Sequence, residues 1–388
     1  LSAGQGDIRL GQVDAAGGAV KVTAGQGSIA ADGAGTHVTA DSLALEAKSG
    51  IGSSATSLAT DVSELTTTNS ANLAGTYVDN QGALNKLDVT TRDGDVVIGT
   101  GPNANVSFSG SSDTLSTSQN TGFETFAFDN TAGGIDLEGG LSATSTSLTA
   151  TGAITGQNGT LTGNRLTLSA GTGIDLTTAV GKLDATATDG DITINNGTHT
   201  AGLTATARAD DGDFTLTTGG DLAVAGIKAS DKVSLSAGGA ITGTAEGTDV
   251  EAARLLLQGN GIGSTADAFT TRVSERLSAQ AGTGGLFLAN VGSLSLLGGE
   301  AGGNIDLSVS GDAILDTLEA NGSITFSATG RVSDGNGDAL NLSGDTLTLS
   351  AQQIGARDGS IDALEVEVDE LVLDTRNGGI FVRKLKGS

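Results

Sequence analysis

The stretch LTLSAGTGIDLTT, from Leu166 to Thr178, alternates apolar with small polar side chains, breaks at glycines, and then alternates again. Successive side chains of a β-strand point to opposite sides, so alternation with a period of two is typical of a strand with one covered face. We therefore predict that Leu166, Leu168 and Ala170 point inward and that the Thr and Ser between them point outward. The glycines supply bends with positive φ between strands.

Nearly the same phrase recurs along the whole chain at a spacing of about twenty residues. Internal repetition at such a period indicates a solenoid or an array of small units. The clearest further copies are LALEAKSGIG from Leu43, LDVTTRDGDVVIG from Leu87, LDATATDGDITI from Leu183, VSLSAGGAITG from Val233, IDLSVSGDAIL from Ile305, LTLSAQQIG from Leu347 and LVLDTRNGGIFV from Leu371.

A longer phrase is also repeated, as GIGSSATSLATDVSEL from Gly50, GIGSTADAFTTRVSERL from Gly261 and IGARDGSIDALEVEVDEL from Ile354. In the first copy the apolar residues Leu58, Val62 and Leu65 have a spacing that also fits turns of an amphipathic helix. One short helix packed on the outside is therefore the local alternative to a strand here.

These patterns predict an all-β fold, a parallel β-helix (β-solenoid) with roughly 20 residues per circuit. Each strand would pair with its counterpart one repeat away, and the inward aliphatic side chains would stack in columns. A sandwich would require longer strands joined as hairpins, and it would not repeat one phrase at a constant period. We expect one continuous solenoid segment over residues 1–388, an interior part of a longer chain, without a separate globular domain.

The composition excludes several classes of protein. With 45 acidic against 19 basic residues and a net charge of −26, the chain lacks the basic surface that binding to nucleic acid requires. Cysteine is absent, which removes disulfides, thiol nucleophiles and thiolate metal sites. No apolar window is long enough for a membrane-spanning helix.

The phrases LTLSAGTGIDL and VSLSAGGAITG and the unit from Gly261 to Leu296 resemble the repeat regions of filamentous-haemagglutinin-like exoproteins. The resemblance implies a right-handed parallel β-helix that an outer-membrane secretion partner exports, as in two-partner secretion. It further implies an extracellular location on the bacterial cell surface and a role as the elongated, rigid shaft of an adhesin. GPNANV at Gly101 does not match the Asn-Pro-Asn-Gly-type export motif of that family, so either the export domain lies elsewhere or the export route differs.

Paired carboxylates are the main candidate residues for catalysis or metal binding. Because the Asp-Gly-Asp pattern recurs before strands, where Asp and Gly favour turns, we interpret these residues as turn formers, with calcium binding and catalysis as alternatives. DGNGD, from Asp334 to Asp338, opens like a calcium loop but lacks its distal Glu. We therefore assign no catalytic, cofactor-binding or metal residue. The paired carboxylates are Asp93, Asp95, Asp189, Asp191, Asp210, Asp211 and Asp213.

The two histidines, His37 and His199, both follow Gly-Thr and are predicted to be solvated turn residues rather than a metal pair or a base. Aromatic residues make up only 3% of the chain, which leaves few platforms for a sugar ring. The FETFAF cluster, with Phe123, Phe126 and Phe128, is expected to pack inside a wider circuit, and a lateral contact is the alternative.

The sequence therefore predicts a structural or adhesive extracellular protein that is not an enzyme and has no evident small-molecule substrate. The first alternative is a self-assembling extracellular fibre or sheath subunit. An alternative of another class is a β-helical polysaccharide-active enzyme, in which three carboxylates and a basic residue would share one groove. Ice binding through Thr-x-Thr ladders is a further alternative, with only irregular matches.

Overall fold

The computed structural model describes residues 1–70, 74–82, 86–91, 96–100, 106–108, 115–116, 125–130, 134–137, 141–244, 247–357 and 361–385. These residues form strands, turns and bends, and none of them is helical. The chain divides into two compact units, Leu1–Gly197 and Thr198–Ser388, and each is described by itself. That residues 1–388 form one continuous solenoid stays a prediction.

The strands of the first unit are β1 (Ser2–Ala3), β2 (Ile8–Leu10), β3 (Val13–Ala24), β4 (Ile29–Ala31), β5 (Val38–Ala47), β6 (Leu58–Asn69), β7 (Thr76–Asn80), β8 (Lys86–Thr91), β9 (Val96–Thr100), β10 (Val106–Phe108), β11 (Leu115–Ser116), β12 (Thr125–Asn130), β13 (Ile135–Leu137), β14 (Leu141–Ser142), β15 (Ser145–Ala150), β16 (Ile154–Ala170), β17 (Ile174–Ala187) and β18 (Ile192–Asn196).

The strands of the second unit are β19 (Leu203–Ala209), β20 (Phe214–Thr218), β21 (Leu222–Ala229), β22 (Lys232–Ala237), β23 (Ile241–Gly243), β24 (Val250–Gly259), β25 (Phe269–Ala281), β26 (Leu286–Asn290), β27 (Leu294–Ala301), β28 (Ile305–Val309), β29 (Ala313–Ala320), β30 (Ile324–Ala328), β31 (Arg331–Asp334), β32 (Leu342–Ala351), β33 (Gln353–Ile354), β34 (Ala356–Arg357), β35 (Ile361–Asp362), β36 (Leu364–Thr375) and β37 (Val382–Lys384).

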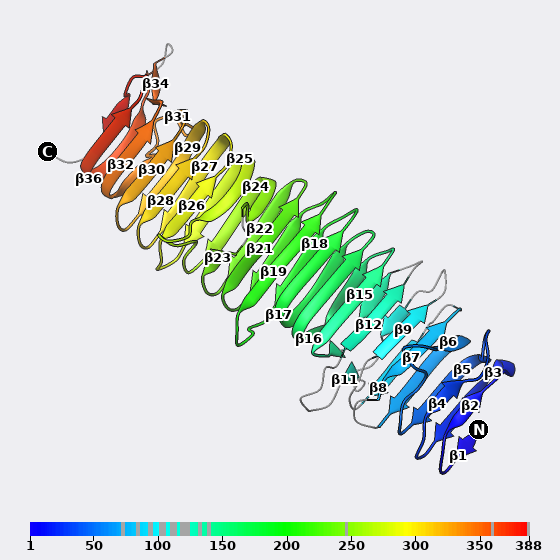
Figure 1. The fold of residues 1–388 in the computed structure, drawn as a ribbon. Helices are drawn as coiled ribbons and strands as arrows, with labels where there is room; N and C mark the ends of the chain where they lie inside the picture. The colour runs from blue at the N-terminus through cyan, green and yellow to red at the C-terminus, as the bar shows by residue number, and fades with distance from the viewer. Residues whose placement is uncertain are drawn as a thin grey trace. The chain divides into compact units, whose positions relative to one another are not determined.

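Within each unit the strands of successive circuits lie side by side and pair in parallel (Figure 1). In the first unit Leu43 of β5 is paired with Leu65 of β6, and in the second Ile305 of β28 is paired with Ile324 of β30. Among the described residues, the strand pairs with a known register are all parallel except for the two-residue hairpin of β34 and β35. The predicted parallel β-solenoid, with circuits of roughly 20 residues, is confirmed in both units, and its right-handed sense stays a prediction.

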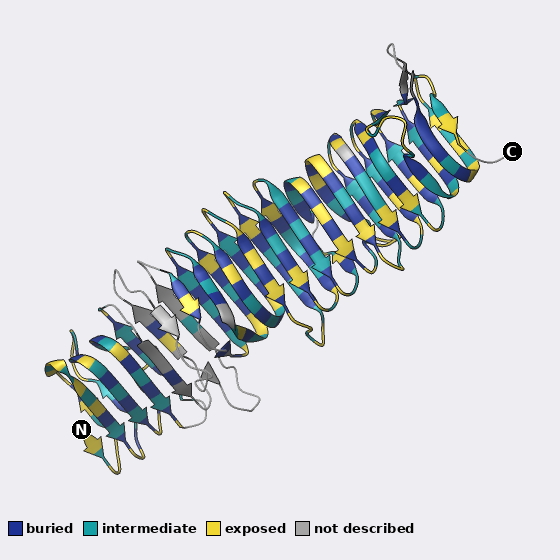
Figure 2. Cartoon of the chain, turned by 180° about the vertical axis from the view of Figure 1, so that it is seen from behind, coloured by how far each residue is buried: buried dark blue, intermediate teal, exposed yellow. Residues whose placement is uncertain are grey.

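The interior of each unit is built from inward-facing aliphatic side chains, as the alternation predicted. Leu166, Leu168 and Ala170 are at most 3% exposed. The register places Leu168 between Leu148 of the preceding circuit and Ala185 of the following one, and both of these residues are buried. Buried and exposed residues alternate along the strands in Figure 2. The repeated phrase therefore produces columns of stacked side chains, one residue from each circuit.

The segment with helix-like spacing is a strand. Leu58, Val62 and Leu65 are all buried and belong to β6. Along β6 the inward positions follow a period of two up to Val62 and resume at Leu65, which shows that the inward set shifts by one residue between them. This shift creates the spacing of four and three residues that also fits a helix, so the helical alternative is wrong.

The repeated Gly-Ile-Gly phrases form tight bends between circuits. Ile51 is fully buried, and isolated parallel bridges join it to Ile29 and Thr76. Gly52 has a φ of +64°, and a Cβ there would lie 2.2 Å from the carbonyl oxygen of Tyr77. Gly263 repeats this geometry, with a φ of +63° and the carbonyl oxygen of Phe287 at the same 2.2 Å. Only glycine avoids both the strain and the clash at these bends.

The FETFAF cluster belongs to a longer circuit. In β12, Phe126 is paired with Val96 of the preceding circuit and with Thr146 of the following one. The circuit that leads from Val96 to Phe126 is therefore 30 residues long, and the next circuit, which leads to Thr146, is 20 residues long. This bears out the expected wider circuit. Phe123 and the side chains of Phe126 and Phe128 lie outside the described part of the chain, so their packing and the lateral contact remain predictions.

Candidate functional site

A buried asparagine closes one corner of the solenoid. The Oδ1 atom of Asn196 accepts hydrogen bonds from the hydroxyl of Thr178 at 2.7 Å and from the backbone N–H of Val180 at 2.9 Å. Its Nδ2 group donates to the carbonyl oxygens of Val180 at 3.3 Å and Gly197 at 3.0 Å. The buried amide thus satisfies its own donors and acceptors and those of the backbone at the corner.

The same arrangement occurs twice more among the described residues. Asn80 bonds to Thr60 at 2.8 Å, and Asn290 bonds to Thr271 at 2.9 Å. Each asparagine also accepts from a valine N–H and donates to that valine's carbonyl oxygen, as Asn196 does. The sequence analysis missed these residues, although Thr-x-Val occurs in all three copies, with the asparagine in the next circuit.

Among the candidate carboxylates, Asp213 has a structural role. Its Oδ1 atom accepts the backbone N–H of Lys232, in the next circuit, at 3.0 Å. Asp221 and Asp312 make the same bond to Ala240 at 2.9 Å and to Arg331 at 2.7 Å. An aspartate just before a strand therefore hydrogen-bonds the bend that contains it to the backbone of the next circuit. This agrees with the prediction that Asp213 is a turn residue.

The other paired carboxylates that the structure describes are exposed on the surface. Asp189 and Asp191 are exposed. Asp210 is exposed and forms an ion pair with Arg208, while Asp211 is exposed beside it. Asp93 and Asp95 lie outside the described residues.

The Asp334–Asp338 loop is held by its own hydrogen bonds. Oδ1 of Asp334 accepts the backbone N–H of Asn336 at 2.9 Å and the side-chain Nδ2 of the buried Asn341 at 2.8 Å. Asp338 is 96% exposed at its side chain and pairs with Arg383 at 3.2 Å. In the described part of the chain no group of three or more His, Cys, Asp or Glu residues is placed to hold a metal ion.

Glu365 is a buried acid close to this loop. Its side chain is 4% exposed and one oxygen is 3.0 Å from the Arg383 guanidinium, while Oε2 has no hydrogen-bond partner. Burial raises the pKa of Glu365 above its ordinary value, and the positive charge of Arg383 opposes that rise. The negative charges of Asp334 and Asp338 raise the pKa further.

The prediction for His37 is wrong. His37 is only 3% exposed, because it bonds to the neighbouring circuit instead of to solvent. Its Nδ1 atom accepts the N–H of Ala59 at 3.1 Å, and Nε2 lies 3.4 Å from the carbonyl oxygen of Gly33. The tautomer with a proton on Nε2 satisfies both contacts. His199 is half-buried, and its Nδ1 accepts the N–H of Ala201 at 3.4 Å.

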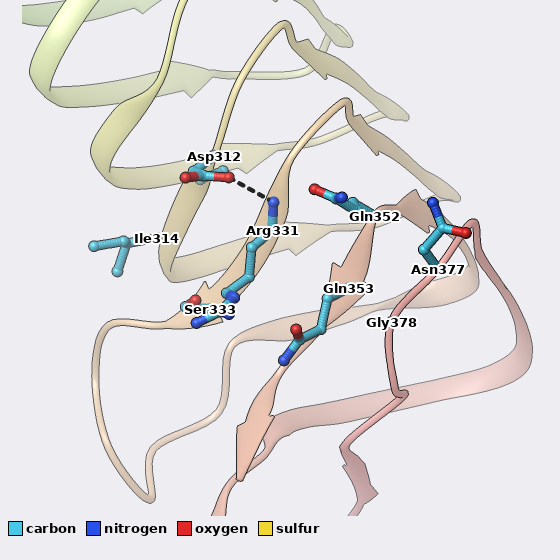
Figure 3. A pocket seen from close by; sticks show the side chains of 9 residues that line it. Asp312, Ile314, Arg331, Ser333, Gln352, Gln353, Asn377 and Gly378 are labelled. Carbon is cyan, nitrogen blue, oxygen red and sulfur yellow. Dashed lines mark hydrogen bonds between the residues drawn. The ribbon is translucent and has the colours of Figure 1, made fainter. Parts of the chain in front are cut away.

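A candidate binding site is a hollow of about 620 Å³ in the second unit, which we call the Arg331 hollow. Asp312, just before β29, and Ile314, within β29, precede Arg331 and Ser333 of β31 in the circuit order. Gln352, Gln353, Asn377 and Gly378 come from the next two circuits. Figure 3 shows Arg331 in the middle of these side chains, with Asp312 on one side and the two glutamines on the other.

A smaller hollow of about 330 Å³ lies on the same unit. The register aligns Ser308, Ser327 and Ser350 in one column across successive circuits, and Asp374 continues it. Arg376 also lines this hollow. The column follows directly from the repeat and carries no ligand assignment.

In the comparisons with known proteins, a family model described as Toastrack DUF4097 matches residues 80–235. This stretch, less than half of the chain, is similar to that family. No curated protein and no solved structure matches the chain. No helix in the described part of the chain is long and apolar enough to span a membrane. Together with the parallel strands of both units, the match supports a structural repeat protein of the β-solenoid type.

Proposed function

We propose that the protein is a structural scaffold on the surface of a bacterial cell, exported by an outer-membrane secretion partner and contributing to adhesion without an active site of its own. The observation that carries this proposal is the use of polar side chains to join one circuit to the next. The Thr178–Asn196 bond has two counterparts in the described chain. The Asp213–Lys232 bond likewise has counterparts elsewhere.

Such bonds favour a mechanical role. Each bond joins two neighbouring circuits, so it stabilises the interface between repeats. A catalytic pair would instead stand once in the chain, with its carboxylates directed to a substrate. The carboxylate of Asp213 is already bonded to a backbone N–H at 3.0 Å.

The net charge supports an exposed scaffold. A chain with a charge of −26 repels other copies of itself and stays soluble, which suits a large exposed surface. The resemblance of the repeated phrases to filamentous-haemagglutinin-like exoproteins supports the surface location and the secretion partner. The elongated shaft stays a prediction that small-angle scattering tests.

Antibodies raised against the folded protein test the location. They are expected to label intact cells of the source bacterium and to lose that label when the gene is deleted. Deletion is also expected to reduce attachment of the cells to host or abiotic surfaces. Labelling only after the cells are made permeable would contradict the proposed location, and unchanged attachment would contradict the adhesive role.

A subunit of an extracellular fibre is the second candidate. Within each unit successive strands pair in parallel, and a second copy of the chain can extend such a ladder with the same kind of pairing. Sedimentation velocity over a range of concentrations tests this candidate, because a fibre subunit forms larger species as the concentration rises.

A further inference from the structure

We propose that the Arg331 hollow binds a sugar that carries one carboxylate, with the Arg331 guanidinium pairing with that carboxylate and the neighbouring amides binding the sugar hydroxyls. The ligand class is thus a uronic acid or a glycan that ends in one. This inference concerns a site on the second unit and holds wherever the protein is located.

The guanidinium of Arg331 is available for a ligand. Arg331 is exposed, and the hydrogen bond that it gives Asp312, at 2.7 Å, comes from its backbone N–H. Within the described residues its guanidinium forms no ion pair, whereas those of Arg254 and Arg383 each face a carboxylate. A guanidinium offers two parallel N–H donors that match the two oxygens of a carboxylate.

The groups around Arg331 match the hydroxyls of a sugar. The Nε2 group of Gln353 donates to the carbonyl oxygen of Gly355 at 2.9 Å, which leaves Oε1 as an acceptor. Gln352 and Asn377 add two amides, and Ser333 adds a hydroxyl. Each amide both donates and accepts, as a sugar hydroxyl does. Ile314, 37% exposed, offers an apolar contact for the C–H groups of a ring.

One wall of the hollow is fixed before any ligand arrives. A Cβ on Gly378 would lie 2.5 Å from the Cβ of Gln353, so this turn packs directly on β33. The hydroxyl of Thr375 donates to the carbonyl oxygen of Gly378 at 3.1 Å, and Ile354 donates its N–H to Gly379 at 3.1 Å. Preorganised walls reduce the ordering cost of binding.

The volume of the hollow and the charges around it restrict the class of ligand. A hollow of about 620 Å³ lies within the range of roughly 300–1,000 Å³ that small-molecule sites occupy. Arg331 is the one cation among the residues that line it, and Asp312, the one carboxylate there, already accepts the backbone N–H of Arg331, while the net charge of the chain is −26. A polymer with many sulfates or carboxylates is therefore repelled by the rest of the surface, whereas a sugar with one carboxylate matches the single cation. Because the hollow offers no aromatic ring to stack on a sugar, the carboxylate pair is the main anchor.

Saturation-transfer NMR with the full chain tests the proposal, with methyl glucuronide as the probe. Methyl glucoside is the neutral match, and acetate is the carboxylate without a sugar. We expect methyl glucuronide to bind with a Kd in the millimolar range and each comparison compound to bind at least about ten-fold more weakly, because each lacks one half of the recognised chemistry. Equal binding of methyl glucoside would overturn the role of Arg331, and equal binding of acetate would overturn the assignment to a sugar.

Substitutions test whether methyl glucuronide binds in the Arg331 hollow. Arg331→Gln should weaken binding of methyl glucuronide at least about ten-fold, and Arg331→Lys should weaken it less, because lysine keeps the charge but loses the paired donors. Gln352→Ala should weaken binding while leaving the charge in place. Arg272→Gln removes an exposed arginine from β25, outside the hollow, and should change nothing. Wild-type binding by Arg331→Gln, an equal loss in Arg272→Gln, or no binding of methyl glucuronide to the wild type would each overturn the proposal.

Discussion

The side-chain amide oxygen of Asn196 lies 2.7 Å from the hydroxyl oxygen of Thr178, 18 residues earlier in the chain, and both side chains are buried. The bond crosses from one circuit to the next at a corner, where the backbone leaves the regular ladder. Unpaired polar groups at such a corner would be costly in the dry interior. The asparagine removes that cost, which explains why the pair recurs as Thr60–Asn80 and Thr271–Asn290.

Replacing Asn196 by alanine is expected to lower the free energy of unfolding by about 2–4 kcal/mol, because buried backbone groups of Val180 lose their partners. Hydrogen exchange at the amide of Val180 should accelerate. Asn195→Ala is the matched control, since the neighbouring Asn195 is exposed, and it should leave exchange unchanged. Similar effects of the two variants would contradict the structural role of the buried amide.

Leu168→Asp is expected to open the circuits around β16, at a cost of about 3 kcal/mol or more, because it places an unpaired charge between Leu148 and Ala185. Urea denaturation measures the loss. Ser169→Asp adds the same charge at the next residue, which is exposed, and should cost far less. If Leu168→Asp kept the wild-type transition, its inward position would be refuted.

Gly52→Ala is expected to destabilise the first unit by about 2 kcal/mol or more. The new Cβ would meet the carbonyl oxygen of Tyr77 at 2.2 Å while the backbone holds a φ of +64°. Gly11→Ala is the control, because nothing lies within 4 Å of a Cβ there and the φ is not in the positive range. Thermal unfolding of the two variants separates the effect of this bend from the general effect of losing a glycine.

The stability of the second unit is expected to depend on pH through Glu365. Because burial raises the folded-state pKa of Glu365 above its ordinary 4.5, the folded state binds the proton more tightly than the unfolded state does. The stability from this residue is therefore fully present below about pH 4.5 and is lost as the pH rises through the folded pKa. Glu365→Gln should remove that loss and flatten the profile of unfolding free energy against pH.

Arg383→Gln tests the role of Glu365 by removing its ion-pair partner. Without the guanidinium, the charged Glu365 has no cation within 4 Å among the described residues, so the variant should be destabilised by about 1–3 kcal/mol at pH 7 and less at pH 4.5. Urea titrations at the two pH values measure the difference. Glu370→Gln, at an exposed position of β36, is the control and should show the wild-type dependence. Equal destabilisation by Arg383→Gln at both pH values would contradict this account.

Some features were beyond the reach of sequence patterns for physical reasons. The spacing of Leu58, Val62 and Leu65 fits a helix and a strand with a shifted inward set equally well, and only pairing with the neighbouring circuits decides between them. His37 has polar neighbours in the sequence, yet it is buried, and its Nδ1 atom accepts a hydrogen bond from the N–H of Ala59, 22 residues later. Neither contact is local, so no short window of sequence contains it.

The sequence by itself determined the strand type, the repeat and the inward residues, because the alternation around Leu166 and Leu168 is a local property with a period of two. It also identified the Asp before a strand as a turn residue, since short polar side chains and glycine favour bends on their own. Only the tertiary structure decided which polar groups meet across circuits. Thr178 and Asn196, Glu365 and Arg383, and the side chains around Arg331 are brought together by the parallel pairing of neighbouring circuits. The Thr–Asn pair forms across separations of 18, 20 and 19 residues, so the pairing register and not a fixed sequence spacing decides which residues meet.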